Sequence, residues 1–297
     1  MILITGASGL IGSELVKRVL KTGKSVVGLD KFPSGVNHAN YQHFTESFDS
    51  DTAFGLAKTA ETIVHLAGAS SSGHFKQSGN DVFWKEIETN VRFFSFLSKN
   101  CQSKIIFAST EWVYGEREGV NPISEESGNV SEISDFYALT KSMLENIILH
   151  NHALKNRTMV ARFGIVLSSK REHLTLIEYV CKKFSTNDKS LKIKSKKIGR
   201  AYILLYDLVE MLEMSIFEHH SGIYNLGGAE FFSVEDVRCL SEKLLGRRLT
   251  LSEEDPGLVN YRNMNSKKFF EKYKYRPRGS ESIVKVLIND FGGKIVE

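Results

Sequence analysis

The chain has 297 residues, of which 41% are hydrophobic and 25% are charged, and its formal net charge is +4 at pH 7. These values are typical of a globular protein with one large domain or two modest ones. The mild charge does not indicate nucleic-acid binding, and the short apolar runs predict neither a membrane span nor a secretory signal. Cys101, Cys181 and Cys239 are isolated from one another, which predicts reduced thiols, no structural metal and a cytoplasmic location.

A short apolar run, Met1–Thr5, leads directly into the three glycines Gly6, Gly9 and Gly12, and the helix-forming run Ser13–Leu20 follows. A tight strand-to-helix turn requires small residues, and the start of a helix offers free N–H groups to a phosphate. We expect Gly6 to take the strained turn, Gly9 to let the backbone approach a pyrophosphate, and Gly12 to let the helix pack on the strand. The sequence therefore predicts a dinucleotide-binding loop.

Asp30 ends the next apolar run, 18 residues beyond Gly12. An acid at this point can accept hydrogen bonds from an adenosine ribose and repels a 2′-phosphate, so we expect NAD rather than NADP. Lys31 beside it acts against this preference and is a candidate cofactor contact. Further candidate cofactor contacts in the loop and at later strand ends are Ser8, Leu10, Ile11, Leu66, Ala67, Gly68 and Ser109.

Short apolar runs alternate with amphipathic runs through the first two-thirds of the chain. The expected further strands are Ser25–Asp30, Thr62–Leu66, Lys104–Ser109 and Thr158–Val166. The expected helices are Ser13–Leu20, Thr52–Lys58, Asp81–Asn100 and Phe136–Asn151. This alternation predicts an α/β fold, a Rossmann-type doubly wound parallel sheet with its ligand at the carboxyl ends of the strands.

The pattern becomes irregular after about Ser168. The elements expected there are strands at Ala201–Leu205 and Gly222–Leu226 and helices at Ser233–Leu245 and Ser280–Phe291. We predict a dinucleotide-binding domain over 1–167, to which 201–227 contributes strands. A smaller, discontinuous substrate-binding lobe is predicted over 168–200 and 228–297.

Basic residues are concentrated between Lys182 and Arg200, a segment that contains eight cationic residues and one acidic residue, Asp188. The run Leu191–Lys196 alternates apolar and basic residues, which predicts a half-buried strand with a lysine-lined outer face. This strand is either an edge protected by lysines or a surface that attracts an anionic substrate. No aromatic residues interleave with the lysines as they do on a base-stacking surface.

Tyr137 and Lys141 stand four residues apart at the start of a strongly helical run, so they share one helix face. A free tyrosine titrates near pH ~10, and a neighbouring cation favours its phenolate, which makes tyrosine usable as a general acid/base. Thr110 ends a strand 27 residues before Tyr137. Its hydroxyl can bind a substrate carbonyl or alcohol oxygen beside the phenol.

These residues resemble the extended short-chain dehydrogenase/reductase superfamily, in particular its NAD-dependent epimerase/dehydratase branch. The matching segments extend over nearly the whole chain and are Gly6–Gly12, His65–Ala69, Glu88–Val91, Phe107–Gly115, Tyr137–Lys141, Arg162–Val166, Arg200–Leu208 and Tyr224–Gly228. The resemblance implies that Tyr137 moves a proton and that Thr110 orients the substrate oxygen. It also implies that Lys141 holds the nicotinamide ribose and lowers the tyrosine pKa. Arg200 would contact a substrate diphosphate.

Some positions depart from the family pattern. Ile165 replaces an asparagine that usually contacts the nucleotide diphosphate, Asp255 replaces an arginine, and Ser195–Ile198 replaces a Gly-Asp-Gly segment. Glu111 stands where sugar 4,6-dehydratases carry an acid and is a candidate substrate contact. Their second acid position holds Trp112, so the dehydratase acid/base pair is incomplete.

The resemblance implies an NAD-dependent oxidoreductase that acts on a nucleotide-activated sugar by hydride transfer, with Tyr137 as general acid/base. One alternative is a reductase of a non-nucleotide carbonyl compound, which the changes at Ile165 and Asp255 favour. Another is a dinucleotide-sensing regulatory protein, against which the presence of Thr110, Tyr137 and Lys141 together argues.

A homodimer is also expected, through a four-helix bundle formed by Asp81–Asn100 and Phe136–Asn151 of two chains. The first of these helices carries more apolar residues than one face over a sheet requires, namely Val82, Phe83, Ile87, Phe93, Phe94 and Leu97. Core packing within one chain is the alternative explanation for them.

Overall fold

The structure is a computed structural model that describes residues 1–69, 72–115, 120–127, 135–186 and 188–296, with only the backbone described for 72–80. It divides into two compact units. The first unit comprises Met1–Gly115, Gly128–Arg162 and Val209–Tyr224. The second comprises Glu116–Ser127, Phe163–Leu208 and Asn225–Glu297.

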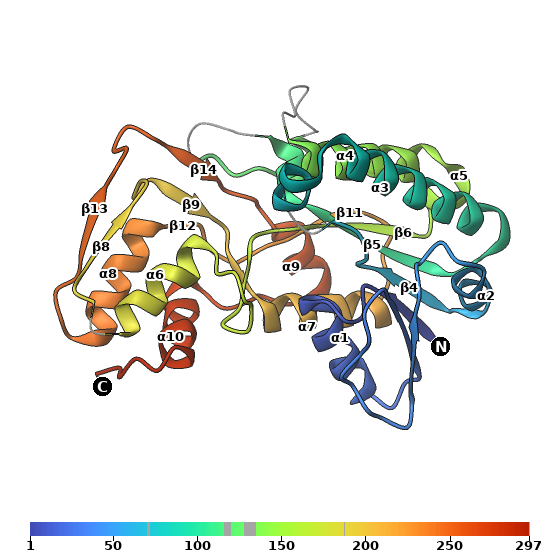
Figure 1. Ribbon diagram of the computed structural model, residues 1–297, viewed down its shortest axis with the longest axis horizontal. Helices are drawn as coiled ribbons and strands as arrows, with labels where there is room; N and C mark the ends of the chain where they lie inside the picture. Colours follow the sequence, from blue (N-terminus) through green and yellow to red (C-terminus); the bar gives the residue numbers. More distant parts are fainter. Residues whose placement is uncertain (70–71, 116–119, 128–134, 187, 297) are drawn as a thin grey trace. The chain divides into compact units, whose positions relative to one another are not determined.

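A seven-stranded parallel sheet with the order β11-β6-β5-β4-β1-β2-β3 forms the centre of the first unit (Figure 1). Its strands are β1 (Ile2–Thr5), β2 (Val26–Asp30), β3 (Tyr41–Thr45), β4 (Thr62–His65), β5 (Lys104–Thr110), β6 (Thr158–Phe163) and β11 (Gly222–Leu226). Because β1 pairs with both β2 and β4, the strand order reverses beside β1, and ligands of such sheets bind at this point. The predicted doubly wound sheet is confirmed.

Helices cover both faces of this sheet. They are α1 (Leu10–Leu20), α2 (Asp51–Thr59), α3 (Ser72–Asn100), α4 (Phe136–His150), α5 (His152–Lys155) and α7 (Leu205–Phe217). In Figure 1, α3, α4 and α5 lie on one face, and α1 and α7 lie on the other. Arg18 of α1 donates to Glu213 at 2.5 Å and to Glu210 at 2.9 Å, which joins α1 to α7.

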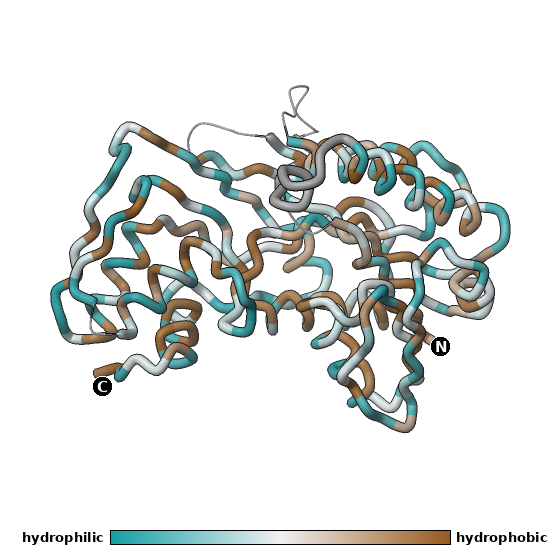
Figure 2. Tube along the Cα trace, in the orientation of Figure 1, coloured by the Kyte–Doolittle hydropathy of each residue, from teal (hydrophilic) through white to brown (hydrophobic). Residues whose placement is uncertain are grey.

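The core beneath α3 and α4 consists of side chains from the strands and from one side of each helix. Hydrophobic and hydrophilic residues alternate along α3 and α4, as Figure 2 shows, because each helix has a buried and a solvent-facing side. The sequence prediction treated part of the apolar content of α3 as surplus. However, Phe93, Phe94 and Leu97 are fully buried against the sheet, and Phe83 is also buried. Phe93, Phe94 and Leu97 therefore belong to the core of this unit.

Some elements differ from those expected. Strand β3 was not predicted, because Tyr41–Thr45 is a partly exposed edge strand that lacks the apolar run of its neighbours. Helix α3 begins at Ser72 rather than at Asp81. The expected strand Ala201–Leu205 is only the two-residue β10 (Ile203–Leu204), after which α7 begins at once.

The second unit combines small sheets with packed helices. Its strands are β7 (Val166–Leu167), β8 (Ser190–Ile193), β9 (Ile198–Arg200), β10, β12 (Phe232–Ser233), β13 (Thr250–Glu253) and β14 (Asn260–Arg262). Its helices are α6 (Leu176–Ser185), α8 (Val234–Leu245), α9 (Lys267–Tyr273) and α10 (Ser280–Asp290). Two short 3-10 helices complete the described elements, η1 (Glu111–Tyr114) in the first unit and η2 (Glu125–Ser127) in the second. Helices α6, α8 and α10 enclose a separate apolar core.

The lysine-rich segment of the second unit forms the predicted half-buried strand. Strand β8 pairs with β13, and Lys192 is exposed whereas Ile193 is buried. Acids lie opposite the lysines: Lys192 pairs with Glu254 at 3.5 Å and Lys196 with Glu253 at 3.6 Å. This favours the protected-strand interpretation over an open anion-attracting surface.

In the part of the chain that the structure describes, no helix is both long enough and apolar enough to cross a membrane.

Candidate active site and cofactor loop

The glycine loop lies between β1 and α1, beside the point where the strand order reverses. Gly6 has a φ of +72°, and a Cβ there would lie 2.8 Å from the backbone nitrogen of Ala67. A Cβ on Gly12 would lie only 2.0 Å from the carbonyl oxygen of Gly6. The structure thus confirms the roles expected for Gly6 in the turn and for Gly12 in helix packing. Gly9 is the N-cap of α1, and Leu10 and Ile11 form its first turn.

Asp30 lies beside this loop at the end of β2. Its carboxylate accepts hydrogen bonds from the backbone N–H of Ser8 at 3.0 Å and of Phe32 at 3.1 Å. The neighbouring Lys31 side chain is exposed. A glycine cradle that side chains would fill, a helix N-terminus and an adjacent carboxylate fit the phosphates and ribose of an adenine dinucleotide.

A buried hydrogen-bonded chain supports the segment Leu66–Gly68 at the end of β4. The Ala67 N–H donates to Thr5 Oγ1 at 3.2 Å, and Thr5 Oγ1 lies 2.7 Å from His65 Nδ1. His65 Nε2 lies 2.9 Å from Asn90 Oδ1 on α3. The pKa of His65 is lowered to about 4, chiefly by burial and to a smaller extent by the charge of Lys141, while the Asn90 hydrogen bond acts in the opposite direction. The imidazole is therefore neutral at pH 7.

The structure brings Thr110, Tyr137 and Lys141 together. The Thr110 side chain, at the end of β5, lies near the phenol of Tyr137 in the first turn of α4 and acts to lower the pKa of that phenol. The Lys141 ammonium donates to the Ala108 carbonyl of β5 at 2.9 Å. Asp135 caps α4 by accepting from the Tyr137 N–H at 2.9 Å. The helix start and the strand end are thus held together where the proposed proton transfer would occur.

The acidity of Tyr137 differs from the expectation. The pKa of Tyr137 is raised to about 12, chiefly by burial of the phenol and to a smaller extent by three carboxylates, in the order Asp135, Glu111 and Glu86. Thr110 acts in the opposite direction and lowers this pKa. We expected Lys141 to depress this pKa. The correction is that burial and nearby negative charge favour the neutral phenol, which suits a proton donor.

Ser109, a predicted cofactor contact, donates a hydrogen bond to Glu145 of α4. Glu145 forms a buried ion pair with Arg162 of β6 at 2.6 Å, and the guanidinium lies over the Tyr114 ring. The predicted substrate contact Glu111 is fully buried. Sequence reasoning did not single out Glu145, although it stands four residues beyond Lys141 on the same helix face. It also missed Glu86, one helical turn before Asn90.

Arg200 belongs to the second unit. Its side chain is buried and donates to the Gly199 carbonyl, the Asn260 carbonyl and Asn260 Oδ1, each at 2.7 Å. Asn260 was not predicted to take part, because its contact with Arg200 depends on the pairing of β9 with β14.

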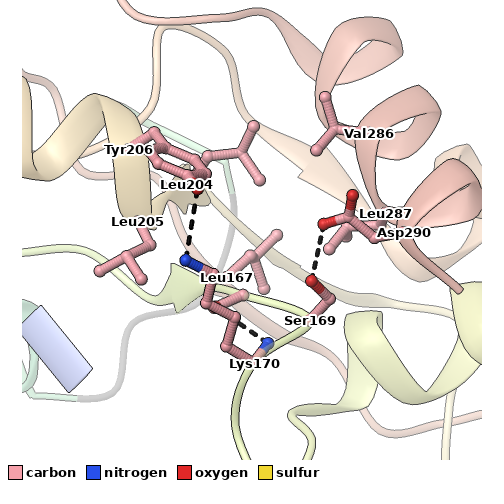
Figure 3. A pocket seen from close by; sticks show the side chains of 10 residues that line it. Leu167, Ser169, Lys170, Leu204, Leu205, Tyr206, Val286, Leu287 and Asp290 are labelled. Carbon is pink, nitrogen blue, oxygen red and sulfur yellow. Dashed lines mark hydrogen bonds between the residues drawn. The ribbon is translucent and has the colours of Figure 1, made fainter. Parts of the chain in front are cut away.

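A separate pocket of about 290 Å³ lies within the second unit (Figure 3). Residues from three segments line it, namely Leu167–Lys170, Leu204–Tyr206, Val286, Leu287 and Asp290. Ser169 donates to Asp290 at 2.6 Å, and the Lys170 ammonium lies 5.2 Å from the centre of the exposed Tyr206 ring. None of the predicted site residues lines this pocket.

The model of the NAD dependent epimerase/dehydratase family matches residues 2–227, which include the glycine loop, Thr110, Tyr137 and Lys141. The chain belongs to this family. It is an enzyme family that depends on NAD, in agreement with the cofactor predicted from the sequence.

Relatives in the epimerase/dehydratase family match most of the chain. The dTDP-4-dehydro-6-deoxyglucose reductase of Escherichia coli is 26% identical over 275 residues, which cover 86% of this chain and 85% of that protein. The UDP-N-acetyl-alpha-D-glucosaminuronate decarboxylase of Bacillus cytotoxicus is 27% identical over 255 residues, which cover 79% and 77%.

Solved structures share the fold of this epimerase/dehydratase chain. The UDP-glucuronic acid 4-epimerase of Bacillus cereus, in complex with UDP-glucuronic acid and NAD, has a TM-score of 0.79 at 22% identity and covers 98% of each chain. The UDP-glucose 4-epimerase of Thermus thermophilus, in complex with NAD, has a TM-score of 0.78 at 19% identity and covers 98% of this chain and 99% of its own.

Proposed function

We propose that the protein oxidises or reduces a carbon of a nucleotide-activated sugar, with Tyr137 as the general acid/base. The observation that carries this proposal is the proximity of the Thr110 hydroxyl to the Tyr137 phenol, with Lys141 one helical turn further on and hydrogen-bonded to the strand that carries Thr110. A substrate oxygen bound between the two side chains would meet both a hydroxyl donor and a phenol.

In the reducing direction, the Tyr137 phenol donates its proton to the carbonyl oxygen as hydride reaches the carbonyl carbon. In the oxidising direction, the phenolate oxygen of Tyr137 takes the proton back from the substrate hydroxyl. Thr110 holds the substrate oxygen in line with the phenol. Lys141 supplies a positive charge near the developing phenolate. NAD, when bound, supplies or accepts the hydride. The raised pKa of Tyr137 means that the proton is present on the phenol at neutral pH.

The proposed cofactor-binding residues are Gly6, Ser8, Gly9, Leu10, Ile11, Gly12, Asp30, Lys31, Leu66, Ala67, Gly68 and Ser109, together with Tyr137 and Lys141. The glycine cradle and the adjacent carboxylate of Asp30 support this assignment. Asp30 supports NAD over NADP because a carboxylate accepts ribose hydroxyls and repels a phosphate.

The nucleotide-sugar assignment is supported by the named activities of relatives, which include enzymes of UDP- and dTDP-sugars. It is tested by thermal-shift measurement with UDP-, GDP-, CDP- and dTDP-sugars in the presence of NAD, followed by product analysis. We expect one nucleotide class to stabilise the protein and to be converted, and we expect Tyr137→Phe to abolish conversion but not stabilisation. Conversion at an unchanged rate in Tyr137→Phe would contradict the mechanism.

A second candidate function is reduction of a carbonyl compound without a nucleotide. It is favoured by Ile165 and Asp255, which replace polar family residues, and by the bonds that tie the Arg200 guanidinium to Asn260. If no nucleotide sugar stabilises the protein while an uncharged carbonyl compound is reduced, this second candidate is correct. Arg200→Ala discriminates further, because it should weaken nucleotide-sugar binding by roughly tenfold or more but leave an uncharged substrate unaffected.

A further inference from the structure

The segment Asp30–Phe32, called here the Asp30 turn, is held in place by hydrogen bonds rather than by packing. The Phe32 ring is 71% exposed, and the side chains on either side of it are exposed as well. The Phe32 carbonyl accepts two hydrogen bonds, from Ser8 Oγ and from His43 Nε2, each at 2.9 Å. The Phe32 N–H donates to Asp30 Oδ1 at 3.1 Å. The position of the turn, and with it that of the carboxylate, therefore depends on a few polar groups.

One of these groups, His43, lies on the edge strand β3. A carbonyl oxygen can only accept, so the bond to Phe32 requires a proton on Nε2 of the imidazole. In the neutral ring Nδ1 is then an acceptor, and the Tyr41 hydroxyl lies 3.0 Å from it. The pKa of Tyr41 is raised, chiefly by burial and to a smaller extent by the charge of Asp30, while Ser34 acts in the opposite direction. The phenol thus keeps its proton and donates a hydrogen bond to the imidazole.

Gly28 leaves room for the Tyr41 hydroxyl. A Cβ built on Gly28, in the middle of β2, would lie 2.1 Å from the Tyr41 hydroxyl oxygen and 2.9 Å from the Cβ of Ala7 in the glycine loop. The hydroxyl therefore occupies the space that any other side chain at position 28 would need. Tyr41 and His43 stand two residues apart on β3, which pairs with β2 over Val26–Asp30, so both side chains project from the same face of the sheet. The edge strand is thereby joined to the Asp30 turn through its side chains.

We propose that His43 is a positioning residue for NAD, which holds the Phe32 carbonyl and so keeps the Asp30 turn in the arrangement that receives the adenosine ribose. This inference rests on the proposed role of Asp30 in cofactor binding. Without the imidazole, Ser8 is the remaining side-chain donor to the Phe32 carbonyl among the described residues. An exposed turn held by fewer bonds must be ordered when the cofactor binds, and the free energy of that ordering is subtracted from the affinity.

The test compares His43→Phe with His43→Gln. Phenylalanine keeps a ring but removes both nitrogens, whereas glutamine offers an amide N–H to the Phe32 carbonyl. His38→Phe is the matched control, because His38 is exposed in the same loop and its ring accepts only from the nearby Asn40 N–H among the described residues. NAD is titrated into each protein by calorimetry. We expect His43→Phe to weaken NAD by roughly fivefold, as for loss of one hydrogen bond, His43→Gln to bind more tightly than His43→Phe, and His38→Phe to bind as wild type does.

A second titration, with ADP, separates positioning of the turn from a general loss of structure. ADP carries the adenosine ribose without the nicotinamide half, so His43→Phe should weaken ADP and NAD by the same factor. Tyr41→Phe removes only the hydroxyl that contacts Nδ1, and it should weaken both ligands by a smaller factor. Melting temperatures measured without ligand verify that the compared proteins are folded.

Equal NAD affinity of wild type and His43→Phe overturns the inference while leaving the proposed function intact. The inference is also overturned if NAD weakens but ADP does not, because the effect would then lie away from the adenosine end. Failure of His43→Gln to bind more tightly than His43→Phe would show that the hydrogen bond to Phe32 is not responsible. A wild-type protein that binds no NAD overturns the proposed function and this inference with it.

Discussion

The Thr5 hydroxyl and Nδ1 of His65 form a 2.7 Å hydrogen bond. The partner on the other side of the ring, Asn90, fixes which imidazole nitrogen carries the proton. Asn90 uses its amide N–H groups for Glu86, so its oxygen must accept from His65 Nε2–H. Nδ1 is then an acceptor and Thr5 the donor. This arrangement has no place for a second proton on the ring, which is why protonation of His65 opposes folding.

We predict that His65 makes stability depend on pH in the mildly acidic range. The pKa is 6.5 in the unfolded chain and about 4 in the folded protein, so the unfolded state binds the proton first as pH falls. The stabilisation is complete above pH 6.5 and is lost progressively toward pH 4. Chemical denaturation should show a loss of about 2 kcal/mol between pH 6.5 and pH 5.

The matched variants are His65→Gln and His152→Gln, the second at an exposed position. The pH-dependent loss should disappear in the first and persist in the second. An equal slope of unfolding free energy against pH in wild type and His65→Gln would show that another group is responsible.

Tyr137→Phe should lower turnover by at least ~10²-fold, the size expected for the loss of a general acid/base. NAD affinity should stay close to that of wild type, because the phenol hydroxyl is not the main cofactor contact. Steady-state kinetics and calorimetry measure the two effects. Tyr179→Phe, on the exposed face of α6, serves as a control and should leave both unchanged.

The Tyr137 phenol should remain protonated in the free protein well above neutral pH, because burial and nearby carboxylates raise its pKa to about 12. The absorbance of phenolate near 295 nm, compared between wild type and Tyr137→Phe, tests this. The two spectra should gain the same phenolate band up to about pH 9. An additional band in the wild type near pH 8 would place the pKa below the ordinary tyrosine value instead.

Asp30 should make the protein prefer NADH over NADPH by at least about tenfold in dissociation constant. Asp30→Ser should reduce this preference, because it removes the negative charge that faces the 2′-position. In an Asp30→Ser background, Lys31→Ala should weaken NADPH again if the lysine contacts its phosphate. Equal or tighter binding of NADPH by the wild type would contradict the role given to Asp30.

A homodimer remains our prediction, but the residues that support it change. Phe93, Phe94 and Leu97 lie in the core, whereas Trp84 of α3 is 63% exposed beside Phe83, which contacts the partly exposed Phe136 of α4. Light scattering at micromolar concentration should give twice the chain mass for wild type and a single mass for Trp84→Glu. Phe217→Glu, at an exposed apolar site on α7, should stay dimeric. A monomeric wild type would refute the prediction.

The sequence predicted those elements whose signal is local. Gly6 and Gly12 could be identified because a left-handed turn and a close helix contact exclude other side chains, and the buried strands are short, largely apolar runs. Helix α7 could not be separated from β10, because its apolar residues face two sides and follow the strand without a break. Strand β3 gave no signal, because it is an edge with exposed polar residues.

The candidate site was also predictable only where its signal is local in the sequence. Thr110, Tyr137 and Lys141 lie in motifs with fixed spacing, and the structure places Thr110 near Tyr137 and joins Lys141 to the strand that ends at Thr110. Glu86 and Asn260 act through partners far along the chain, so no spacing within the sequence indicates them. The direction of the Tyr137 pKa shift depends on burial, which sequence spacing does not reveal.

The division into two units has a consequence for how the protein is made. The chain passes from one unit to the other after Gly115, Ser127, Arg162, Leu208 and Tyr224. During synthesis, the central sheet lacks β11 until the ribosome has passed residue 226, although every residue of the proposed catalytic group has been added by Lys141. No single truncation yields either unit alone. A chain that ends before residue 226, although it retains the whole glycine loop and Tyr137, should therefore fail to give a stable NAD-binding fragment.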